Sequence, residues 1–418
     1  MAYRVKDIKL AAQGAANIEW AEAHMPVLML IRKRFAKEKP LKGAKVAACL
    51  HVTKETAVLM RTLRAGGAEV RLCASNPLST QDDVAAALAK EGIPVFAVKG
   101  ENNADYYKDL NSVLDLKPNI TVDDGADLIN AIHSKRPELM ANLWAGQEET
   151  TTGVIRLRAM AKAGALKYPV IAVNDTPTKC LFDNHFGTGQ STLHGIMNAT
   201  TFMIPGSTIV VVGYGNCGKG VTKFARGMGA KIIVVEVNPV EALRAHLDGC
   251  MVMSMKDAAK AGDLFITVTG NKHVIRKEHF ELMKDGAIVC NSGHFDIELN
   301  LKDLDSIKKF KREIMPLVEE YTLKDGRRII VLAQGRLVNL ACAKGHSSDV
   351  MDMSFSNQAL CSEYIAKNKD KLSENRVYDV PKEIDNIVAE LKLKAHGLGL
   401  ERLTPEQVEY LNSFKEGT

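Results

Sequence analysis

The sequence lacks the features that mark secreted, membrane-bound and disulfide-stabilised proteins. Its N-terminus has no apolar signal core, and no run reaches the roughly 18 apolar residues that a membrane span requires. The eight cysteines form no C-x-x-C pair, and Cys49, Cys73 and Cys290 lie inside apolar, strand-like runs. This usage predicts buried thiols in a reducing compartment, without disulfides or a zinc site. We therefore expect a cytoplasmic protein with no membrane contact.

A strong excess of charge is also missing. The formal net charge is +5, spread over 418 residues, and basic and aromatic residues are not interleaved as in nucleic-acid-binding proteins. We interpret the densest basic stretch, Lys308 to Arg312 (KKFKR), as a solvated helix face, and we expect no nucleic-acid partner. With 46% hydrophobic and 25% charged residues, the composition is that of a soluble protein. The length predicts two or three domains.

The stretch from Ser207 to Pro239 carries the strongest motif. An apolar strand pattern is followed by Gly213, Gly215 and Gly218 in G-x-G-x-x-G spacing, then by a helical run and a second strand that ends at Glu236. This spacing permits a tight turn, close approach of the backbone to a pyrophosphate, and packing of helix on strand. An acid about 20 residues further on accepts the ribose 2′-hydroxyl. Because a carboxylate repels a 2′-phosphate, the motif predicts NAD over NADP.

Alternating strand and helix patterns predict an α/β fold with two doubly wound parallel sheets. One alternating unit runs from Lys45 to Asp175 and lacks the glycine motif, and the other runs from Ser207 to Leu340. The expected domains are a substrate domain at 1–181 (completed by 344–385), a Rossmann NAD domain at 182–343, and a C-terminal oligomerisation segment at 386–418.

Three helical stretches flank these units. Ile8 to Lys37 should be interrupted near Pro26. Asp349 to Lys367 has the pattern of one amphipathic helix, and its position suggests a crossover back towards the first domain. Leu403 to Thr418 looks like a short polar helix with a tail, which more often serves oligomer contacts than chemistry.

Polar residues gather where five strands end. A histidine after a strand, or an Asp-Asp-Gly turn, is usually an ordinary loop residue when taken alone. Ligands bind beyond the carboxyl ends of strands in open α/β sheets, so five such clusters together predict an active site. The clustered residues are His51, Thr53, Glu55, Thr56, Asp123, Asp124, Glu148, Glu149, Thr150, Thr151, Thr152, Asn174, Asp175, Lys179, Asp183, Asn184 and His294.

The residue types in these clusters indicate acid–base chemistry. A lysine buried beside acids and a nicotinamide can have its pKa lowered enough to take a proton from an alcohol, and Lys179 is the candidate. Asp183 or Glu149 would orient it. His51 and His294 are suited to proton transfer near neutral pH. The spacing suggests neither a metal site nor a Ser-His-Asp triad.

Together the motifs resemble the S-adenosyl-L-homocysteine hydrolase (adenosylhomocysteinase) family. They occur in the family's order from near Met25 to Leu360, so the resemblance covers most of the chain. The matching stretches include LHVTKETAVLMRTLRAGGAEV, DDGADL, EETTTGV, NDTPTK, VVVGYGNCGKG, KDGAIVCNSGHFD, GRRIIVLAQGRLVNLACAKGH and FSNQAL.

The resemblance implies a hydrolysis that proceeds through a temporary oxidation. NAD would oxidise the ribose 3′-hydroxyl, with Lys179 as base and with Asp183 and Glu149 holding the 3′ and 2′ hydroxyls. The 3′-ketone acidifies the C4′ proton, homocysteine leaves from C5′, water adds, and the NADH formed returns its hydride. The resemblance also implies that Asp124, His51 and His294 would manage the proton transfers at C4′ and C5′.

The resemblance also implies the binding residues and the partners. The substrate is a nucleoside thioether, the assembly a homotetramer, and no metal takes part. Substrate-binding positions are Thr53, Glu55, Thr56, Asn174 and His346. Cofactor-binding positions are Thr150, Thr151, Thr152, Asn184, Gly213, Gly215, Asn216, Cys217, Gly218, Glu236, Thr269, Asn271 and Asn339.

The chain departs from the family pattern at a few positions. Thr188 stands where many members have cysteine, Asn216 where aspartate is common, and Glu241 where asparagine often contacts the ribose. The longer tail whose lysine and tyrosine reach a neighbouring NAD in many relatives is absent, so we expect a looser cofactor site. Short-tailed archaeal and some bacterial members share this feature.

Other functions remain open at this point. Glu55 can accept a hydrogen bond from adenine or from hypoxanthine, so S-inosyl-L-homocysteine is an alternative substrate, although adenosyl specificity is commoner in the family. An ordinary NAD-dependent dehydrogenase would instead accumulate reduced, exchangeable cofactor. A non-catalytic nucleotide sensor would be expected to lose some of the six proposed catalytic residues, and all six are present.

Overall fold

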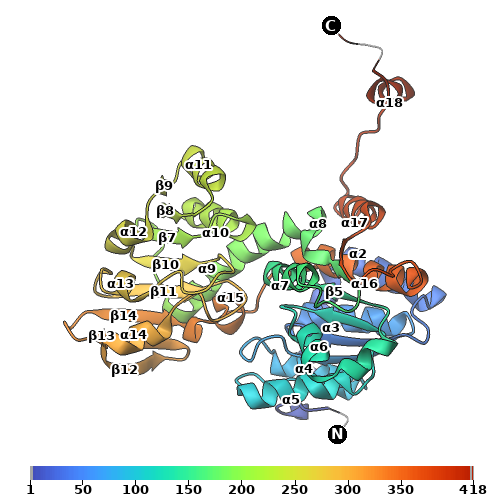
Figure 1. Ribbon diagram of the computed structural model, residues 1–418, viewed down its shortest axis with the longest axis horizontal. Helices are drawn as coiled ribbons and strands as arrows, with labels where there is room; N and C mark the ends of the chain where they lie inside the picture. Colours follow the sequence, from blue (N-terminus) through green and yellow to red (C-terminus); the bar gives the residue numbers. More distant parts are fainter. Residues whose placement is uncertain (1–2, 415–416, 418) are drawn as a thin grey trace.

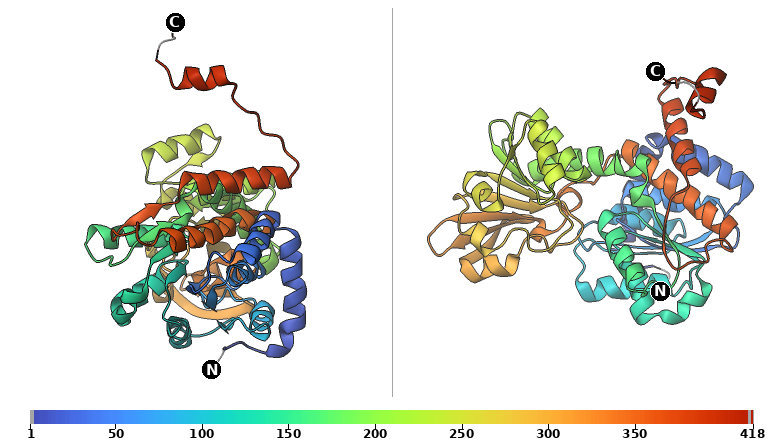
Figure 2. Two further views of the ribbon diagram at one scale, coloured as in Figure 1. Left: turned by 90° about the vertical axis from the view of Figure 1, so that its right-hand side faces the viewer. Right: turned by 45° about the horizontal axis from the view of Figure 1, so that its top comes forward.

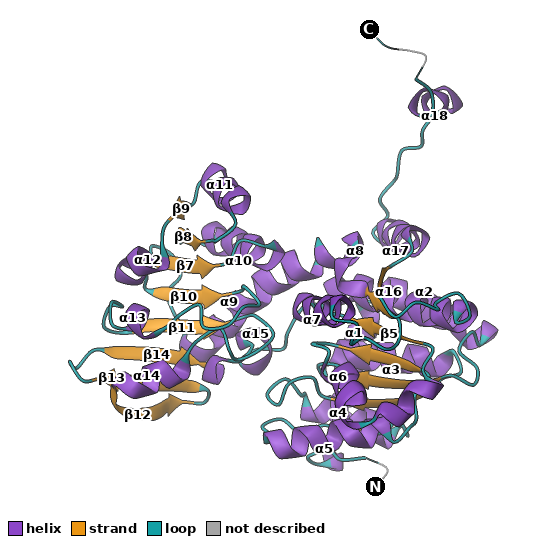
Figure 3. Ribbon diagram, in the orientation of Figure 1, coloured by secondary structure: helices purple, strands orange, loops and turns teal. Residues whose placement is uncertain are grey.

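Two α/β units lie side by side, each built around a twisted sheet (Figure 1; Figure 3). The structure, a computed structural model, describes residues 3–414 and residue 417. The prediction of two doubly wound parallel sheets followed by a short C-terminal segment is confirmed. No helix among the described residues is long and apolar enough to cross a membrane.

The first sheet has the strand order β15-β6-β5-β4-β1-β2-β3, and its neighbouring strands pair in parallel. Helices cover both faces, and the central strands β1, β4 and β5 are accordingly buried almost throughout. The strands are β1 (Lys45–Cys49), β2 (Glu69–Cys73), β3 (Val95–Phe96), β4 (Ile120–Asp123), β5 (Ala145–Glu148), β6 (Val170–Ala172) and β15 (Val377–Asp379). The helices are η1 (Ile8–Leu10), α1 (Ala11–Ala23), α2 (Pro26–Glu38), α3 (Lys54–Ala65), α4 (Asp82–Lys90), α5 (Asn103–Leu114), α6 (Asp127–Lys135), η2 (Pro137–Asn142) and α7 (Thr151–Lys162).

The expected interruption near Pro26 is confirmed. Helix α1 ends at Ala23, and Pro26 opens α2 in its first turn, where the missing N–H of proline costs no hydrogen bond.

The second sheet has the order β12-β13-β14-β11-β10-β7-β8-β9, parallel from β14 to β9 and antiparallel at the β12–β13–β14 edge. Its strands are β7 (Thr208–Val212), β8 (Lys231–Val235), β9 (Met251–Val252), β10 (Leu264–Thr267), β11 (Ala287–Asn291), β12 (Lys308–Met315), β13 (Val318–Leu323) and β14 (Arg328–Leu332). The helices around it are α9 (Thr188–Thr200), α10 (Asn216–Gly227), α11 (Pro239–Leu247), α12 (Met255–Ala261), α13 (Lys277–Phe280), α14 (Leu301–Ile307), η5 (Ala333–Gly335) and α15 (Val338–Ala341). Between the units lie η3 (Val173–Asp175), α8 (Pro177–Cys180) and η4 (Asp183–Gly187).

The basic stretch from Lys308 to Arg312 is not a helix face, and that interpretation was wrong. It begins β12, which pairs antiparallel with β13. Pairing supplies the backbone hydrogen bonds that the sequence pattern alone could not reveal. The charged side chains suit an edge strand, because they discourage pairing with another chain.

The crossover after the second sheet is confirmed. Helix α16 (Ser348–Asn368) packs into the core of the first unit, where Met353 and Phe355 join the same apolar cluster as Leu28, and β15 then pairs with β6. The amphipathic pattern expected for this helix was wrong, because its polar residues Ser354, Asn357 and Gln358 are fully buried.

The C-terminal segment leaves the body of the molecule. Helix α17 (Lys382–Ala395) lies on the first unit, and an extended stretch then carries α18 (Pro405–Leu411) away from it (Figure 2). The helix is present as predicted, but it is not purely polar, because Val408, Tyr410 and Leu411 are exposed. Part of the predicted tail, residues 415–416 and 418, lies outside the described residues.

Candidate active site

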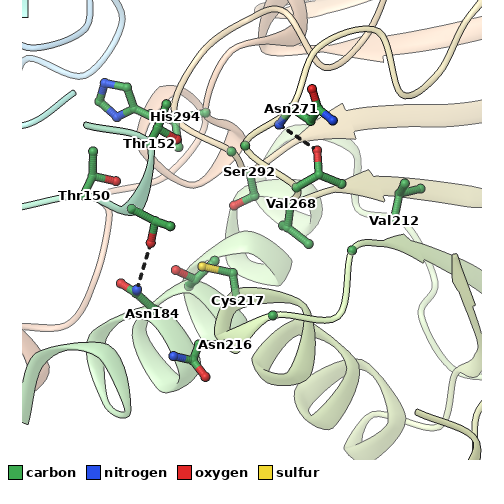
Figure 4. Close-up of a pocket in the computed structure, with 18 of the residues that line it drawn as sticks. Thr150, Thr152, Asn184, Val212, Asn216, Cys217, Val268, Asn271, Ser292 and His294 are labelled. Carbon is green, nitrogen blue, oxygen red and sulfur yellow. Dashed lines mark hydrogen bonds between the residues drawn. The ribbon is translucent and has the colours of Figure 1, made fainter. Parts of the chain in front are cut away.

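The two sheets meet at their topological switch points. In the first sheet the chain winds outwards in opposite directions from β1 and β4, and in the second from β7 and β10. His51 follows β1, Asp124 follows β4, Gly213 follows β7 and Thr269 follows β10. These strand ends open into one cavity of about 1110 Å³ that both units line (Figure 4). Ligands bind at such points in open α/β sheets.

The glycine motif forms an open cradle at the start of α10. Gly213 turns out of β7 with φ +104°, a conformation that favours glycine. Gly215 caps α10, and a Cβ added to it would meet nothing within 4 Å, so the backbone is open to a ligand there. Gly218 does not line the cavity. A Cβ on Gly218 would lie 2.0 Å from the carbonyl oxygen of Gly213, so this glycine serves the packing of helix on strand.

Glu236 is fixed at the end of β8 by backbone groups. Its Oε2 accepts from the N–H of Tyr214 at 2.6 Å, and its Oε1 accepts from the N–H groups of Val237 at 2.7 Å and Asn238 at 2.9 Å. A carboxylate held in this way can accept a hydrogen bond from a ribose hydroxyl, and it repels a 2′-phosphate. Together with the open cradle at Gly215, this fits NAD.

Residues from both units complete the cofactor side of the cavity. Thr150, Thr152 and Asn184 face Asn216 and Cys217 at the start of α10 (Figure 4). Asn184 donates to Thr151 Oγ1 at 3.5 Å. Asn339 is buried, and its Oδ1 has no hydrogen-bond partner within the described part of the chain. An orphaned acceptor at this place fits a donor on the cofactor, such as its carboxamide.

Lys179 lies at the centre of the site with two acids. Its Nζ is 3.4 Å from Asp183 Oδ1 and 3.6 Å from Glu149 Oε1, and it donates to Asn184 Oδ1 at 2.8 Å and Asn174 Oδ1 at 3.4 Å. Lys179 and Asp183 are 3% exposed, and Glu149 is 5% exposed. The site therefore keeps three ionisable groups almost out of water.

The expected lowering of the Lys179 pKa does not occur in this state. Burial alone would lower the pKa of Lys179, but the carboxylates of Asp183 and Glu149 outweigh it and raise the pKa above the usual value. Burial raises the pKa of Glu149 to about 8 even though Lys179 opposes the shift. At Asp183, burial is outweighed by Lys179 and His346, which keep the pKa well below the usual range. Lys179 thus holds its proton in this arrangement.

His51, Asp124 and His294 form a second group across the cavity. Asp124 Oδ2 lies 3.3 Å from His51 Nε2, and Asp124 Oδ1 lies 3.5 Å from His294 Nδ1. His51 Nδ1 contacts Ser79 Oγ at 2.8 Å. Burial, only partly offset by Asp124, lowers the pKa of His51 to about 4, so His51 is neutral near pH 7. A Cβ on Gly125 would lie 2.1 Å from His294 Nε2, so only glycine leaves room for that ring.

The sequence spacing suggested no metal site, yet these three side chains lie within 4.8 Å of one another and could hold an ion. Two histidines beside one carboxylate can also act as general acid and base.

Glu55 and His346 also line the cavity. Glu55 Oε1 accepts from Ser348 Oγ at 2.6 Å and pairs with Lys54. His346 Nδ1 lies 3.2 Å from Asp183 Oδ1. Thr53 and Thr56 line the same cavity. A carboxylate at this position can only accept hydrogen bonds.

Every residue predicted to act in catalysis or to bind substrate or cofactor lines this cavity, except Gly218. Of the polar residues clustered at strand ends, Asp123 and Glu148 do not line it. Sequence reasoning missed several residues that hold the site in place. Glu298 accepts from the N–H groups of Thr269 and Gly270, and Glu148 accepts from those of Gly125, Ala126 and Thr150. Glu148 is the last residue of β5 and was named among the polar residues at strand ends, but its role of holding these backbone groups was not predicted.

Fold and site together define an NAD-binding α/β enzyme with a shared cavity between two sheets. Residues 2–143 match the family described as S-adenosyl-L-homocysteine hydrolase, and residues 184–345 match its NAD binding domain. The chain is 61% identical to the adenosylhomocysteinase of Aquifex aeolicus and 58% identical to that of Sulfurisphaera tokodaii. It is 56% identical to the S-inosyl-L-homocysteine hydrolase of Methanocaldococcus jannaschii. In each comparison all of both chains is covered. The chain belongs to the S-adenosyl-L-homocysteine hydrolase family, and its cofactor is NAD.

Proposed function

We propose that the protein catalyses the reversible hydrolysis of S-adenosyl-L-homocysteine to adenosine and L-homocysteine. The observation that carries this proposal is the position of Lys179. It lies between Glu149 and Asp183 in a cavity that runs on into the dinucleotide cradle. A base between two acids beside a nicotinamide suits removal of a proton from a ribose hydroxyl. Full-length relatives named adenosylhomocysteinase support the same activity.

Each residue of the lysine group then has a role in binding and proton transfer. Glu149 and Asp183 hold the 2′ and 3′ hydroxyls, and Lys179 takes the 3′-hydroxyl proton. Bound NAD supplies the oxidising capacity that makes C3′ a ketone and so acidifies the hydrogen on C4′. Lys179 would release that proton more readily beside the positive charge of a bound nicotinamide ring, which would oppose the carboxylates that raise its pKa.

The histidine group handles the second half of the reaction. Asp124, with His51 and His294 on either side, removes and returns the C4′ proton and assists departure of sulfur from C5′. His51 is neutral near pH 7 because of its burial, so it can accept a proton. The unactivated thioether becomes a leaving group next to an acidified carbon, and water replaces it at C5′.

The preferred base is adenine in this proposal, with hypoxanthine as the second candidate. Glu55 accepts a hydrogen bond equally from the adenine amino group or from hypoxanthine N1–H, and one relative is an S-inosyl-L-homocysteine hydrolase. The test measures homocysteine release from both thioethers at equal concentration. We expect faster release from the adenosyl compound and no net reduced cofactor. A strong preference for the inosyl compound would reverse the assignment, and accumulation of reduced NAD would point to a dehydrogenase.

We further propose the domain limits 1–181 with 344–385, 182–343 and 386–418, and a cytoplasmic homotetramer in the methyl cycle. Buried cysteines without disulfides support a reducing compartment.

The segment beyond α17 supports assembly, because it exposes Leu400, Leu403, Leu411 and Phe414 to solvent away from the body. Native mass spectrometry of the full chain and of a chain ending at residue 397 tests this. We expect four chains for the first and smaller assemblies for the second; identical masses would remove the assembly role of the segment.

A further inference from the structure

We propose that Ser354 and Gln358 on α16 are positioning residues for the lysine and its two carboxylates. Each donates a hydrogen bond to one carboxylate oxygen, of Asp183 or of Glu149, so that the other oxygen of that carboxylate faces Lys179. The role rests on the proposed function, because it concerns the same proton transfer. These two residues are called the α16 donors below.

The contacts of the α16 donors are complementary to those of Lys179. Ser354 Oγ donates to Asp183 Oδ2 at 2.7 Å, and Gln358 Nε2 donates to Glu149 Oε2. The other oxygen of each carboxylate, Asp183 Oδ1 and Glu149 Oε1, is the one that faces Lys179 Nζ. In each acid, therefore, one carboxylate oxygen accepts a hydrogen bond from α16 and the other oxygen faces Lys179.

Helical spacing makes this double grip possible. Ser354 and Gln358 are four residues apart, so they lie on one face of α16, one turn above the other. Between them Asn357 donates to Thr178 Oγ1 at 2.7 Å, beside Lys179 in sequence. One rigid helix from the C-terminal part of the chain thus fixes both acids and the turn that carries the lysine.

Packing alone does not explain these polar residues. Both α16 donors are fully buried, where a polar side chain costs free energy unless it is hydrogen-bonded. Gln358 Oε1 has no partner within the described residues, so Gln358 leaves one polar atom unsatisfied while it donates to Glu149. An apolar side chain of the same size would fill the core without that cost.

The α16 donors also favour the charged form of both acids. At Glu149 burial raises the pKa, while Lys179 and then the Gln358 donor lower it. At Asp183 burial is opposed by Lys179, by His346 and by Ser354. The charged groups Lys179, His346 and Asp124 act on the two acids, and the titratable His51, Cys217 and Cys361 also lie within reach of one of them. Without the α16 donors each carboxyl group would bind a proton at higher pH and could rotate away from the lysine.

The test compares Ser354→Ala and Gln358→Met with Ser356→Ala as a matched control. Ser356 is on the same helix and equally buried, but its hydroxyl has no hydrogen-bond partner within the described residues. For each variant, kcat and KM for homocysteine release are measured across pH, together with NAD content and Tm. We expect the two test variants to lose about tenfold or more in kcat, with the acid limb of the pH profile moved to higher pH. Ser356→Ala should match the wild type.

A further variant guards against misfolding. Ser354→Cys keeps the volume with a weaker donor, so its kcat should lie between those of the wild type and Ser354→Ala. Test variants with wild-type kcat and an unmoved pH profile would overturn the positioning role alone, and so would a loss of kcat without a shift of the acid limb. A wild-type protein that releases no homocysteine from either thioether would overturn the proposed function and this role with it.

Discussion

At the scale of single residues, Lys179 shows how burial and charge compete. Burial disfavours its ammonium, yet two carboxylates within 3.6 Å keep it protonated. Replacing Lys179 by Ala removes the proposed base and leaves Glu149 and Asp183 facing each other. Since a positioned general base contributes about 10² to 10⁴ in rate, homocysteine release should fall by that factor. Steady-state assays check this, with NAD content as the control for folding. Full activity in the variant would refute the assigned base.

His51 should make stability depend on pH. Its pKa is about 4 in the fold against 6.5 for a free histidine, so the unfolded chain binds more protons in this window. Stability is therefore fully present above pH 6.5 and is lost as the pH falls towards 4. Urea midpoints of His51→Gln should fall less over this range than those of the wild type. The exposed His246→Gln is the control and should follow the wild type. Equal slopes in all three proteins would contradict the buried, neutral state of His51.

At the scale of elements, the glycines of the α10 cradle separate packing from binding. Gly218→Ala places a Cβ against the Gly213 carbonyl, whereas Gly215→Ala meets no protein atom. The first variant should lose about 1–3 kcal/mol of unfolding free energy. The second should keep its stability but bind NAD at least about tenfold more weakly, since the new methyl occupies the place of the pyrophosphate. Denaturation and NAD titration measure both quantities. The reverse pattern would show that the two glycines have been assigned the wrong roles.

The elements also show what could be predicted from the sequence. The strand ends could be predicted because each apolar run stops at polar residues. Parallel strands then bring those ends to one edge of the sheet. His51, Asp124 and Lys179 were found in this way. The buried polar face of α16 was not, because helical periodicity locates apolar residues and gives no reason to bury Ser354 or Gln358. The direction of the Lys179 pKa shift could not be predicted, because it depends on how close Nζ lies to Glu149 and Asp183. The sequence does not give these distances.

At the scale of the whole molecule, one cavity depends on both sheets and on the returning chain. The first unit supplies His51, Asp124, Glu149 and Lys179. The second unit supplies the dinucleotide cradle and His294, and α16 returns to pack on the first unit. The group of His51, Asp124 and His294 needs both units, because His294 follows β11 of the second sheet while His51 and Asp124 follow β1 and β4 of the first. The β12 edge was misread because its strand character comes from pairing with β13, which is a property of the assembled sheet.

The central claim is that the nucleoside is oxidised temporarily so that its C4′ hydrogen becomes acidic. The most direct measurement uses S-adenosyl-L-homocysteine labelled with deuterium at C4′ and follows the label by mass spectrometry during turnover in ordinary water. We predict that the label is lost to solvent, both from the adenosine formed and from substrate recovered before completion. Release of homocysteine with the C4′ deuterium fully retained in both would contradict the account.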